Sequence, residues 1–338
     1  MKQTKTMKKP LVSICCITYN QELYLRDALD GFIMQKTDFP FEIVISDDCS
    51  SDGTREIIAD YKKNYPNLIV DVSPEKNRGV IENWKYVHIQ AKGELIAFCE
   101  GDDYWTNPLK LQKQVEYMLS NPDCGLCITD FRYQNDLDKK HISEPAFASG
   151  STFKPTSFIE HLKNAGYIGP MTWMYRRELF VNNIKDYVGI TDGTLALALD
   201  MFWGAEVAYI PEVTAVYRIH SGSAANQVNT KKHMQYAKGA CNTQYYYAKK
   251  YKCNPEIINE LKMQNYTTSM LLAIDSGDQE FVQEALLYYK DKGLYMKWFV
   301  ESCKEYVNYK HQYEQIRSSK AYRLGKVLLK PFKWFKRK

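Results

Sequence analysis

The sequence Ile96-Ala-Phe-Cys-Glu-Gly-Asp-Asp-Tyr-Trp105 decides the fold, because an apolar run there ends abruptly in three carboxylates within four residues. The apolar part is typical of a buried strand, and Gly101 allows the chain to bend sharply after it. Carboxylate oxygens are the ligands that Mg²⁺ and Mn²⁺ prefer. A solvated acidic turn is the competing interpretation, but the aromatic pair at 104–105 favours a walled pocket. The stretch therefore predicts a buried strand with a metal-binding turn at its end.

Around this stretch, the first 130 residues alternate short apolar runs typical of strands with longer runs typical of helices. This alternation predicts an α/β fold, Rossmann-like, with a mostly parallel sheet and flanking helices. In such a sheet, ligands gather at the carboxyl ends of the strands. Strands are expected at 11–18, 41–46, 68–72 and 94–99, and helices at 22–35, 52–65, 79–92 and 108–120.

Polar residues stand at the ends of two further strands. Thr18-Tyr19-Asn20 follows the first, and Asp47-Asp48 follows the second. Adjacent acids repel each other unless donors or a cation meet them, and a nucleoside offers ribose hydroxyls and the uracil N–H as donors. Ser51 and Asp52 are explained by helix capping alone. The sequence has neither GxGxxG after the first strand nor GxxxxGK[ST], so a bound phosphate compound would need a metal on carboxylates.

The strand and helix pattern loosens from about 150 to 225. A strand is expected at 171–175, a helix after Thr191-Asp192-Gly193, and a strand pair at 207–210 and 213–218. From 231 to 316 the sequence is polar, rich in Tyr and Lys and helical in pattern, which predicts a helical extension. The CxxC of Cys124 and Cys127 has no second pair, which favours a buried strand over a metal site.

The formal charge of +5 is unevenly distributed along the chain. Residues 1–10 and 317–338 hold 13 of the 45 basic residues and none of the 40 acidic ones, so 11–316 has 32 basic and 40 acidic residues, a net charge of −8. The last 22 residues also interleave Leu, Phe and Trp with nine basic side chains. This pattern predicts a basic amphipathic tail that contacts an anionic membrane surface. Nucleic-acid binding is the competing interpretation.

Apolar runs and cysteines bear on the compartment. No run approaches the length of a membrane span, and the first, at 11–17, is too short for a signal sequence. The nine cysteines are scattered, mostly within apolar runs, as expected for reduced thiols. We therefore expect a cytoplasmic protein, held peripherally at the inner face of the cell membrane by its tail.

Six motifs, in this order along the chain, resemble those of family 2 glycosyltransferases with the GT-A fold. They are Val12–Asn20 with Glu22, Asp47–Thr54, Asn77-Arg-Gly79 with Asn83, Ala91-Lys-Gly-Glu94, Glu100-Gly-Asp-Asp103 and Val216–His220. Glu100 stands where the family has the first Asp of its DxD motif. The resemblance implies a GT-A domain over 10–225, which leaves a helical extension at 226–316 and the tail at 317–338.

The resemblance also implies a reaction and a site. The reaction is the inverting transfer of a sugar from a nucleoside-diphosphate sugar, most commonly a UDP-sugar, to a hydroxyl of a glycan or lipid-linked acceptor in bacterial surface polysaccharide synthesis, such as capsule or lipopolysaccharide. The cofactor would be Mn²⁺ or Mg²⁺. The residues implied in binding the nucleotide sugar are Thr18, Tyr19, Asn20, Glu22, Asp47, Asp48, Asn83, Glu100 and Arg218.

The remaining implied roles have structural alternatives. Asp192 would be the general base, although an Asp before a helical run also suits an N-cap. The metal ligands would be Asp102, Asp103 and His220, of which a His at a strand end also suits a structural role. On the acceptor side, the resemblance implies Trp105, Thr172 and Trp173. Both tryptophans are suited to sugar stacking and equally to the core.

Two further functions compete with this one. A nucleotidyltransferase would share an α/β sheet and metal carboxylates, but it is expected to carry a basic, Gly-rich loop after the first strand, and 18–24 has neither feature. A non-catalytic membrane-surface binding or scaffold protein could retain the fold, although the complete set of acids argues for turnover. Because the body between the termini is acidic, no nucleic-acid partner is expected.

Overall fold

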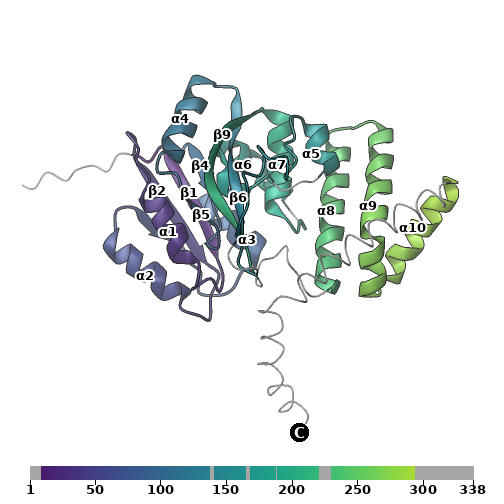
Figure 1. Cartoon of the computed structure of the whole chain (residues 1–338), viewed down its shortest axis with the longest axis horizontal. Helices are drawn as coiled ribbons and strands as arrows, with labels where there is room; N and C mark the ends of the chain where they lie inside the picture. Colours follow the sequence, from purple (N-terminus) through teal and green to yellow (C-terminus); the bar gives the residue numbers. More distant parts are fainter. Residues whose placement is uncertain (1–8, 138–140, 165–167, 188, 221–229, 294–338) are drawn as a thin grey trace, which may run out of the picture. The chain divides into compact units, whose positions relative to one another are not determined.

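The computed structural model describes residues 9–137, 141–164, 168–187, 189–220 and 230–293 (Figure 1). The chain divides into two compact units. The first runs to Tyr133 and resumes over Ile142–Arg218, and the second comprises Gln134–His141 and the chain from Ile219 onward. The basic tail at 317–338 lies outside the described residues.

A nine-stranded mixed sheet forms the centre of the fold, in the order β3-β2-β1-β4-β8-β6-β9-β5, with β7 paired to β6. The first four strands of this order are parallel, and β8 runs antiparallel to both β4 and β6. The strands are β1 (Val12–Thr18), β2 (Phe41–Asp47), β3 (Ile69–Asp71), β4 (Leu95–Phe98), β5 (Tyr104–Trp105), β6 (Cys124–Asn135), β7 (His141–Ile142), β8 (Met174–Arg176) and β9 (Glu206–Ile219).

The strand order explains where a ligand site forms. From β1 the chain proceeds to β2 on one side, whereas β4 pairs with β1 on the other, so the order reverses between β1 and β4. Thr18 stands opposite Asp47 in the β1–β2 ladder. In open α/β sheets, ligands bind outside the carboxyl ends of strands at such a reversal. The predicted polar turns after β1, β2 and β4 therefore meet at one edge.

Seven helices of the first unit and three of the second are described. They are α1 (Leu25–Ile33), α2 (Thr54–Asn64), α3 (Val80–Gln90), α4 (Lys110–Ser120), α5 (Phe158–Asn164), α6 (Arg177–Asn183), α7 (Gly193–Gly204), α8 (Thr230–Lys250), α9 (Pro255–Ser276) and α10 (Gln279–Asp291), with short 3₁₀ turns at Pro170–Thr172 and Ile184–Asp186. The predicted α/β fold is thus confirmed, as is a helical C-terminal region. No helix in these described ranges combines the length and apolar character that a bilayer span requires.

Alternating side chains along the strands separate two packed layers. Val12, Ile14 and Cys16 of β1 join the core cluster that contains apolar residues of α1, α2 and α4. The intervening Cys15 contacts α3 on the other face, where its Sγ lies 3.8 Å from the carbonyl of Val87. Burying each large apolar side chain contributes about 1.5–3 kcal/mol, so this two-sided packing holds the sheet edge in place.

Two sequence-based strand predictions are corrected by the structure. The strand pair expected at 207–210 and 213–218 is one continuous strand, β9. β5 pairs with β9 only at Ala215 and Val216. Pro211 therefore lies outside this pairing, where its missing backbone N–H costs no hydrogen bond to β5. The strand expected at 171–175 begins instead with a 3₁₀ turn at Pro170–Thr172, and β8 starts at Met174.

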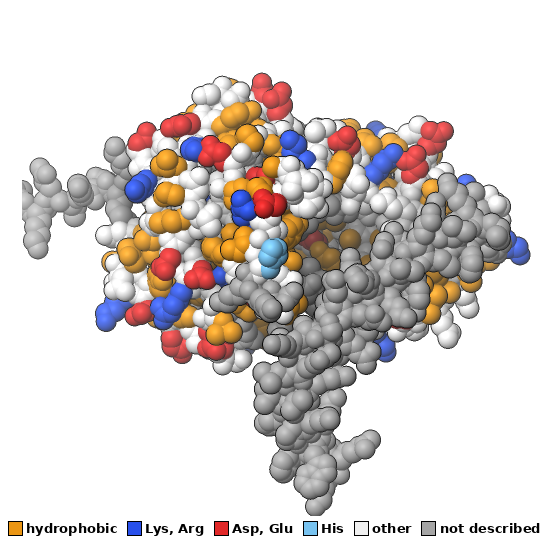
Figure 2. Space-filling view, viewed as in Figure 1, with side chains coloured by type: hydrophobic (Ala, Val, Ile, Leu, Met, Phe, Trp, Pro, Cys, Tyr) orange, Lys and Arg blue, Asp and Glu red, His pale blue; other side chains and the backbone are white. Residues whose placement is uncertain are grey.

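In the second unit, α8 and α10 both pack against α9 (Figure 1). Asn254 caps α9 by accepting from the backbone N–H of Glu256, and Gly277, with φ of 77°, ends it. Met234, Leu272, Ala273 and Phe281 form the apolar cluster between these helices. On the face shown in Figure 2, acidic, basic and apolar side chains of the described residues are interspersed.

Candidate active site

Hydrogen bonds join the loops after β1 and β2 into one structure. Asn20, in the left-handed region with φ of 53°, accepts through Oδ1 from the backbone N–H of Ser51 at 2.8 Å. The carboxylate of Glu22 accepts from the backbone N–H of Gly53 at 2.7 Å. Tyr19 is 51% exposed. Of these predicted nucleotide ligands, Asn20 and Glu22 therefore shape the loops, and all three residues are exposed.

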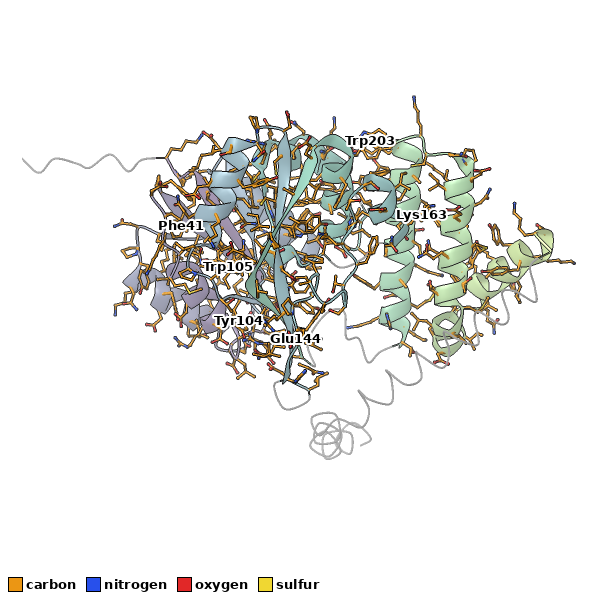
Figure 3. The ribbon with its side chains drawn as sticks, turned by 45° about the horizontal axis from the view of Figure 1, so that its top comes forward. Phe41, Tyr104, Trp105, Glu144, Lys163 and Trp203 are labelled. Carbon is orange, nitrogen blue, oxygen red and sulfur yellow. The ribbon has the colours of Figure 1, made fainter. Side chains whose placement is uncertain are left out.

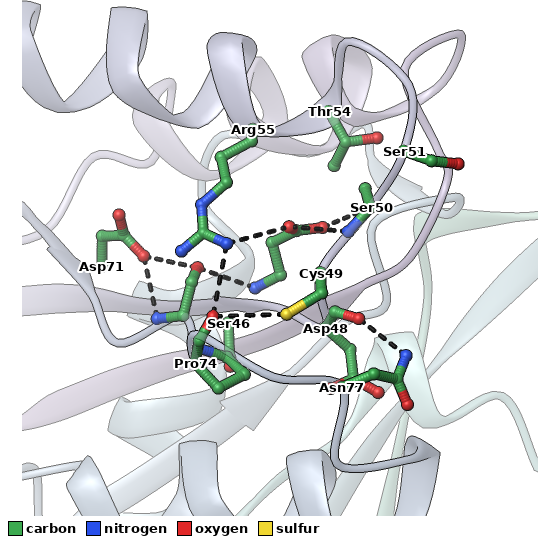
Figure 4. Close-up of polar contacts among 12 residues, drawn as sticks. Ser46, Asp48, Cys49, Ser50, Ser51, Thr54, Arg55, Asp71, Pro74 and Asn77 are labelled. Atoms are coloured by element: carbon green, nitrogen blue, oxygen red, sulfur yellow. Dashed lines mark hydrogen bonds and ion pairs between the residues drawn. The ribbon is translucent and has the colours of Figure 1, made fainter.

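Asp47 is committed to groups of the chain itself (Figure 4). Its carboxylate accepts from the backbone N–H of Ser50 at 3.1 Å and from the same residue's hydroxyl, and Arg55 lies 3.8 Å away as an ion partner. The side chain is 0% exposed. The donors that relieve its repulsion from Asp48 thus belong to the loop and to α2, and a contact of Asp47 with a nucleoside stays a prediction.

Asp48 anchors the segment that precedes α3. Its two carboxylate oxygens accept from the backbone N–H groups of Arg78, at 2.7 Å, and Gly79, at 2.9 Å. Asn77 donates to the Asp48 carbonyl at 2.8 Å (Figure 4). Each carboxylate oxygen can accept more than one hydrogen bond, so Asp48 keeps acceptor capacity although it is only 4% exposed.

Arg78 is a candidate that the sequence reasoning missed. Its side chain is exposed, and its guanidinium lies 3.7 Å from the ring centroid of Tyr86 on α3. The backbone of the same residue binds Asp48. The Asn77-Arg-Gly79 motif was the available sequence signal. It indicated the loop, but it did not indicate that the side chain of Arg78 is exposed while its backbone binds Asp48.

Asn83 is buried behind this loop. Its amide accepts from the Ser46 hydroxyl at 2.5 Å and donates to the Ser46 carbonyl at 3.1 Å. Asn83 is 1% exposed, and its binding of the nucleotide sugar stays a prediction. It fastens α3 to the end of β2.

The acidic turn after β4 is pressed against the end of β1. The backbone N–H of Gly101 donates to the carbonyl of Ile17 at 3.0 Å. A Cβ at position 101 would lie 2.6 Å from Oε1 of Gln21 and 3.0 Å from Cβ of Thr18, so a side chain here would have to displace Gln21 or the turn itself. Thr18 is 3% exposed, and its hydroxyl has no hydrogen-bond partner among the described residues.

The carboxylates of this turn act strongly on one another. Burial, followed by the charges of Asp102 and Asp192, raises the pKa of Glu100 to about 8. Burial, followed by the charges of Asp102 and Glu100, raises the pKa of Asp103 well above its usual range. Crowded carboxylates of this kind are stabilised by a cation, and their hard oxygens suit Mg²⁺ or Mn²⁺. The residues present therefore fit a divalent metal.

Arg218 fixes the acidic turn from β9. Its guanidinium donates to the Asp102 carbonyl at 2.8 Å and to the carboxylate of Asp27 at 2.6 Å. Its backbone N–H donates to Oδ1 of Asp103 at 2.8 Å. Arg218 is 3% exposed, its contact with the donor stays a prediction, and Asp103 is partly committed to this structural bond.

Asp192 caps α7, as one of its two sequence interpretations predicted. Its Oδ1 accepts from the backbone N–H groups of Thr194, at 2.9 Å, and Leu195, at 3.0 Å, and from the Thr194 hydroxyl at 2.7 Å. Its charge also contributes to the raised pKa of Glu100. Capping and proximity to the acidic turn therefore coexist, and the cap fixes how the carboxylate is held.

The residues expected on the acceptor side lie in the core. Trp105 is 2% exposed, donates through Nε1 to the Met171 carbonyl at 2.7 Å and packs against Phe32 (Figure 3). Trp173 is 1% exposed, and its Nε1 donates to Ile168. Thr172 is 0% exposed. All three side chains are buried, and their contacts with an acceptor stay predictions.

A ready-made metal cage is not part of the site. Across the described ranges, no three His, Cys, Asp or Glu side chains are grouped so as to hold a metal ion by themselves. His220, the third predicted ligand, is 6% exposed and belongs to the second unit. Mg²⁺ commonly binds through one or two carboxylates, with substrate phosphates and water completing its shell, so the acidic turn needs no third protein ligand.

Sequence comparisons bear on the whole arrangement. The model of the family described as Glycosyl transferase family 2 matches residues 13–182, about half of the chain. TuaG of Bacillus subtilis, named for teichuronic acid biosynthesis, is 34% identical over 227 residues, covering 64% of this chain and 82% of TuaG. An uncharacterised protein of Mycobacterium tuberculosis is 40% identical over 215 residues, covering 62% of this chain but only 59% of that protein.

Solved structures with the same fold share little sequence. TarS 1–349 of S. aureus in complex with UDP-GlcNAc superposes with a TM-score of 0.55 at 16% identity, over 83% of this chain and 92% of that one. The mannosyltransferase PcManGT from Pyrobaculum calidifontis, in complex with GDP-Man and Mn²⁺, gives 0.51 at 17% identity over 89% and 87%. These likenesses confirm the expected GT-A architecture.

Proposed function

The chain belongs to glycosyl transferase family 2, and from that premise we propose that it is a metal-dependent, inverting glycosyltransferase. It moves a sugar from a nucleoside-diphosphate sugar to a hydroxyl of a glycan or lipid-linked acceptor in bacterial surface polysaccharide synthesis. The observation that carries this proposal is that Asp102 and Asp192 both act electrostatically on the buried Glu100, in the turn after β4 at the carboxyl edge of the sheet. It supports a cation site and a further carboxylate in one place.

Asp102 and Glu100 are the residues proposed to hold the cation. When bound, a divalent ion neutralises the negative charge that develops on the departing diphosphate. Arg218 supports this step indirectly, because its bond to the Asp102 carbonyl keeps the turn in place. The Mn²⁺ in the PcManGT structure, which has the same fold, is consistent with this assignment.

Asp192 is the proposed base. As the acceptor oxygen attacks the anomeric carbon, the bond from that carbon to the diphosphate oxygen breaks, and the hydroxyl proton passes to the Asp192 carboxylate. Attack from the face opposite the leaving group inverts the anomeric configuration. The bonds from Thr194 and Leu195 support this role by fixing Oδ1.

The donor is proposed to bind over the joined loops after β1 and β2. Asp48 offers acceptor oxygens to the N–H of a base. Tyr19, directly after the end of β1, is exposed. Arg78 adds an exposed cation that can contact a phosphate or the ring of a base. A UDP-sugar is the first candidate, as in the TarS complex, although PcManGT carries GDP-Man.

The test is release of UDP from a panel of UDP-sugars in the presence of Mn²⁺ and lipid-linked oligosaccharides. Asp102→Asn and Asp192→Asn are each expected to lower transfer by about 100-fold or more, because each removes a group that acts in the transition state. Asp102→Asn should also weaken Mn²⁺ binding, whereas Asp192→Asn should not. Asp60→Asn, an exposed carboxylate of α2, is the matched control.

Two results would contradict the proposal. Near-normal transfer by Asp192→Asn would exclude it as the base. Tight, Mn²⁺-dependent binding of a nucleotide sugar without turnover, in every acceptor pool tried, would instead favour the non-catalytic scaffold interpretation. A thermal-shift screen of nucleotide sugars, with and without Mn²⁺, identifies the donor first, because specific ligands stabilise the folded state.

A further inference from the structure

Trp84 of α3 lies directly beneath the first turn of α7. A Cβ built at Gly193 would lie 2.7 Å from Cε3 of Trp84 and 2.9 Å from its Cδ2 and Cζ3. These are atoms of the six-membered ring of the indole, and they are the nearest atoms that such a Cβ would meet. Gly193 therefore exists as glycine because the helix rests against this ring.

The indole cannot yield easily, because three other rings surround it. Its centroid lies 4.9 Å from that of His88, 5.2 Å from Phe180 and 5.7 Å from Tyr187. Trp84 is 3% exposed. Tyr187 also donates to the carboxylate of Asp200, on α7, at 3.0 Å. The cluster thus fixes the position of α7 from below as well as along its length.

The carboxylate of Asp192 depends on the position of this helix. Asp192 accepts hydrogen bonds from Thr194 and Leu195, in the first turn of α7. Gly193, the residue between the base and those donors, is the one that rests on Trp84. A shift of α7 away from the indole therefore carries the carboxylate with it.

The N-terminal part of α3 contacts the loops proposed to bind the donor. Arg78 and Gly79, which precede the helix, donate to the carboxylate of Asp48, and Asn83 is bonded to Ser46 at the end of β2. Trp84 is the next residue after Asn83. One helix thus contacts the proposed donor loops and supports the helix that carries the proposed base.

We propose that Trp84 is a positioning residue that sets the place of Asp192 through Gly193. This inference rests on the proposed function, since it assigns Trp84 a part in the same reaction. It predicts that added side-chain volume between α3 and α7 lowers the rate of transfer without weakening the binding of the donor. A displacement of about 1 Å in a catalytic group can cost about 100-fold in rate.

The first experiment measures transfer and donor binding separately in the full-length protein. Gly193→Ala should lower kcat by about 10- to 100-fold, with donor Kd within about threefold of the parent. Combining it with Trp84→Phe, which lacks the ring whose Cε3 and Cζ3 atoms obstruct the new methyl group, should restore at least part of kcat. Trp203→Phe is the matched control, because Trp203 is on α7, the helix of Gly193, but is 52% exposed.

Dependence on the base separates positioning from a general structural effect. In an Asp192→Asn background, Gly193→Ala should cause no further loss of kcat, because residues that act as a unit are not additive. An additive loss would overturn the proposal. Normal kcat in Gly193→Ala, beside an inactive Asp192→Asn, would overturn it as well, while leaving the proposed function intact.

Hydrogen exchange decides the geometry even if no turnover is found. Amide protection at Thr194 and Leu195, the two donors to Asp192, should fall by more than tenfold in Gly193→Ala and recover with Trp84→Phe added. Unchanged protection in Gly193→Ala would refute the proposal, because the first turn of α7 would then not depend on the contact between Gly193 and Trp84. Failure of the proposed function alone would appear differently, as absent transfer in the parent with this exchange pattern preserved.

Discussion

Arg218 illustrates how a single buried cation can organise an acidic turn through bonds to several of its groups. Besides its bonds to Asp27 and the Asp102 carbonyl, its guanidinium lies over the rings of Tyr24, at 5.0 Å, and Tyr104, at 4.7 Å. A planar guanidinium serves several acceptors in fixed directions, whereas an ammonium acts as a point charge. The shape of the turn therefore depends on arginine and not on positive charge alone.

Arg218→Lys is expected to lower the free energy of unfolding by about 1–3 kcal/mol, because the Asp102 carbonyl loses a buried donor. Mn²⁺ binding should weaken by about tenfold as the turn loosens. Asp27→Asn is the control, and its effect should stay below about 1 kcal/mol, because the side chain of Asp27 is 57% exposed. Calorimetric titration with Mn²⁺ and chemical denaturation measure the two effects. A lysine variant that matches the parent in both would show that charge alone suffices.

His88 makes stability depend on pH. Burial lowers its pKa to about 4, partly offset by the bond between Nδ1 and the Trp84 carbonyl. Between pH 6.5 and 4 the unfolded chain binds a proton at this position that the folded chain does not. Stability from this residue is therefore present near pH 7 and is lost as the pH falls, by about 2 kcal/mol at pH 5.

His88→Phe should remove that part of the pH dependence. Phenylalanine preserves the stacking with Phe98 and Phe180, so stability at pH 7 should change by only about 1 kcal/mol, for the lost hydrogen bond. Urea denaturation at pH 7 and pH 5 measures the difference. His141→Gln, at an exposed histidine, should leave the difference unchanged. If His88→Phe loses as much stability on acidification as the parent, another group controls it.

At the scale of elements, the sequence predicted the parallel half of the sheet well and the antiparallel half poorly. β1, β2 and β4 are short apolar runs whose polar ends show in the local sequence. The pairing of Tyr104 with Val216 joins residues far apart in the chain, and no local pattern encodes it. The same reason applies to the site. The sequence shows that Asp48 follows a strand, but it does not show that its carboxylate accepts a hydrogen bond from the backbone of Arg78, which is distant in the chain.

The close contact between the acidic turn and β1 also belongs to this scale. Gly101→Ala is expected to displace the turn, because the new methyl group would lie 2.6 Å from Gln21 Oε1 and 3.0 Å from two atoms of Thr18. Mn²⁺ affinity should fall by more than tenfold with α-helical content unchanged. Gly204→Ala is the control, since no atom lies within 4 Å of a Cβ there. Normal Mn²⁺ affinity in Gly101→Ala would mean that the turn holds its shape without this contact.

Over the whole molecule, charge is divided between an acidic body and basic ends. Residues 11–316 carry a net charge of −8 although the chain as a whole is at +5. Carboxylates at the sheet edge belong to the proposed metal and substrate site, and Figure 2 shows both signs interspersed on the face in view. A surface of this kind does not attract polyanions generally. Binding to an anionic surface should therefore depend on the termini.

Removing residues 317–338 is expected to abolish binding to vesicles that contain phosphatidylglycerol, while transfer to a soluble acceptor is retained. Each basic residue near an anionic membrane contributes about 1 kcal/mol, so nine of them suffice for reversible attachment. Trp334 and Phe335 should add apolar contact, so Trp334→Ala with Phe335→Ala weakens binding but keeps its dependence on salt. Vesicle cosedimentation at low and high salt separates the two contributions. Unchanged vesicle binding by the truncated protein would move the membrane contact elsewhere, and loss of nucleic-acid binding instead would favour the competing interpretation of the tail.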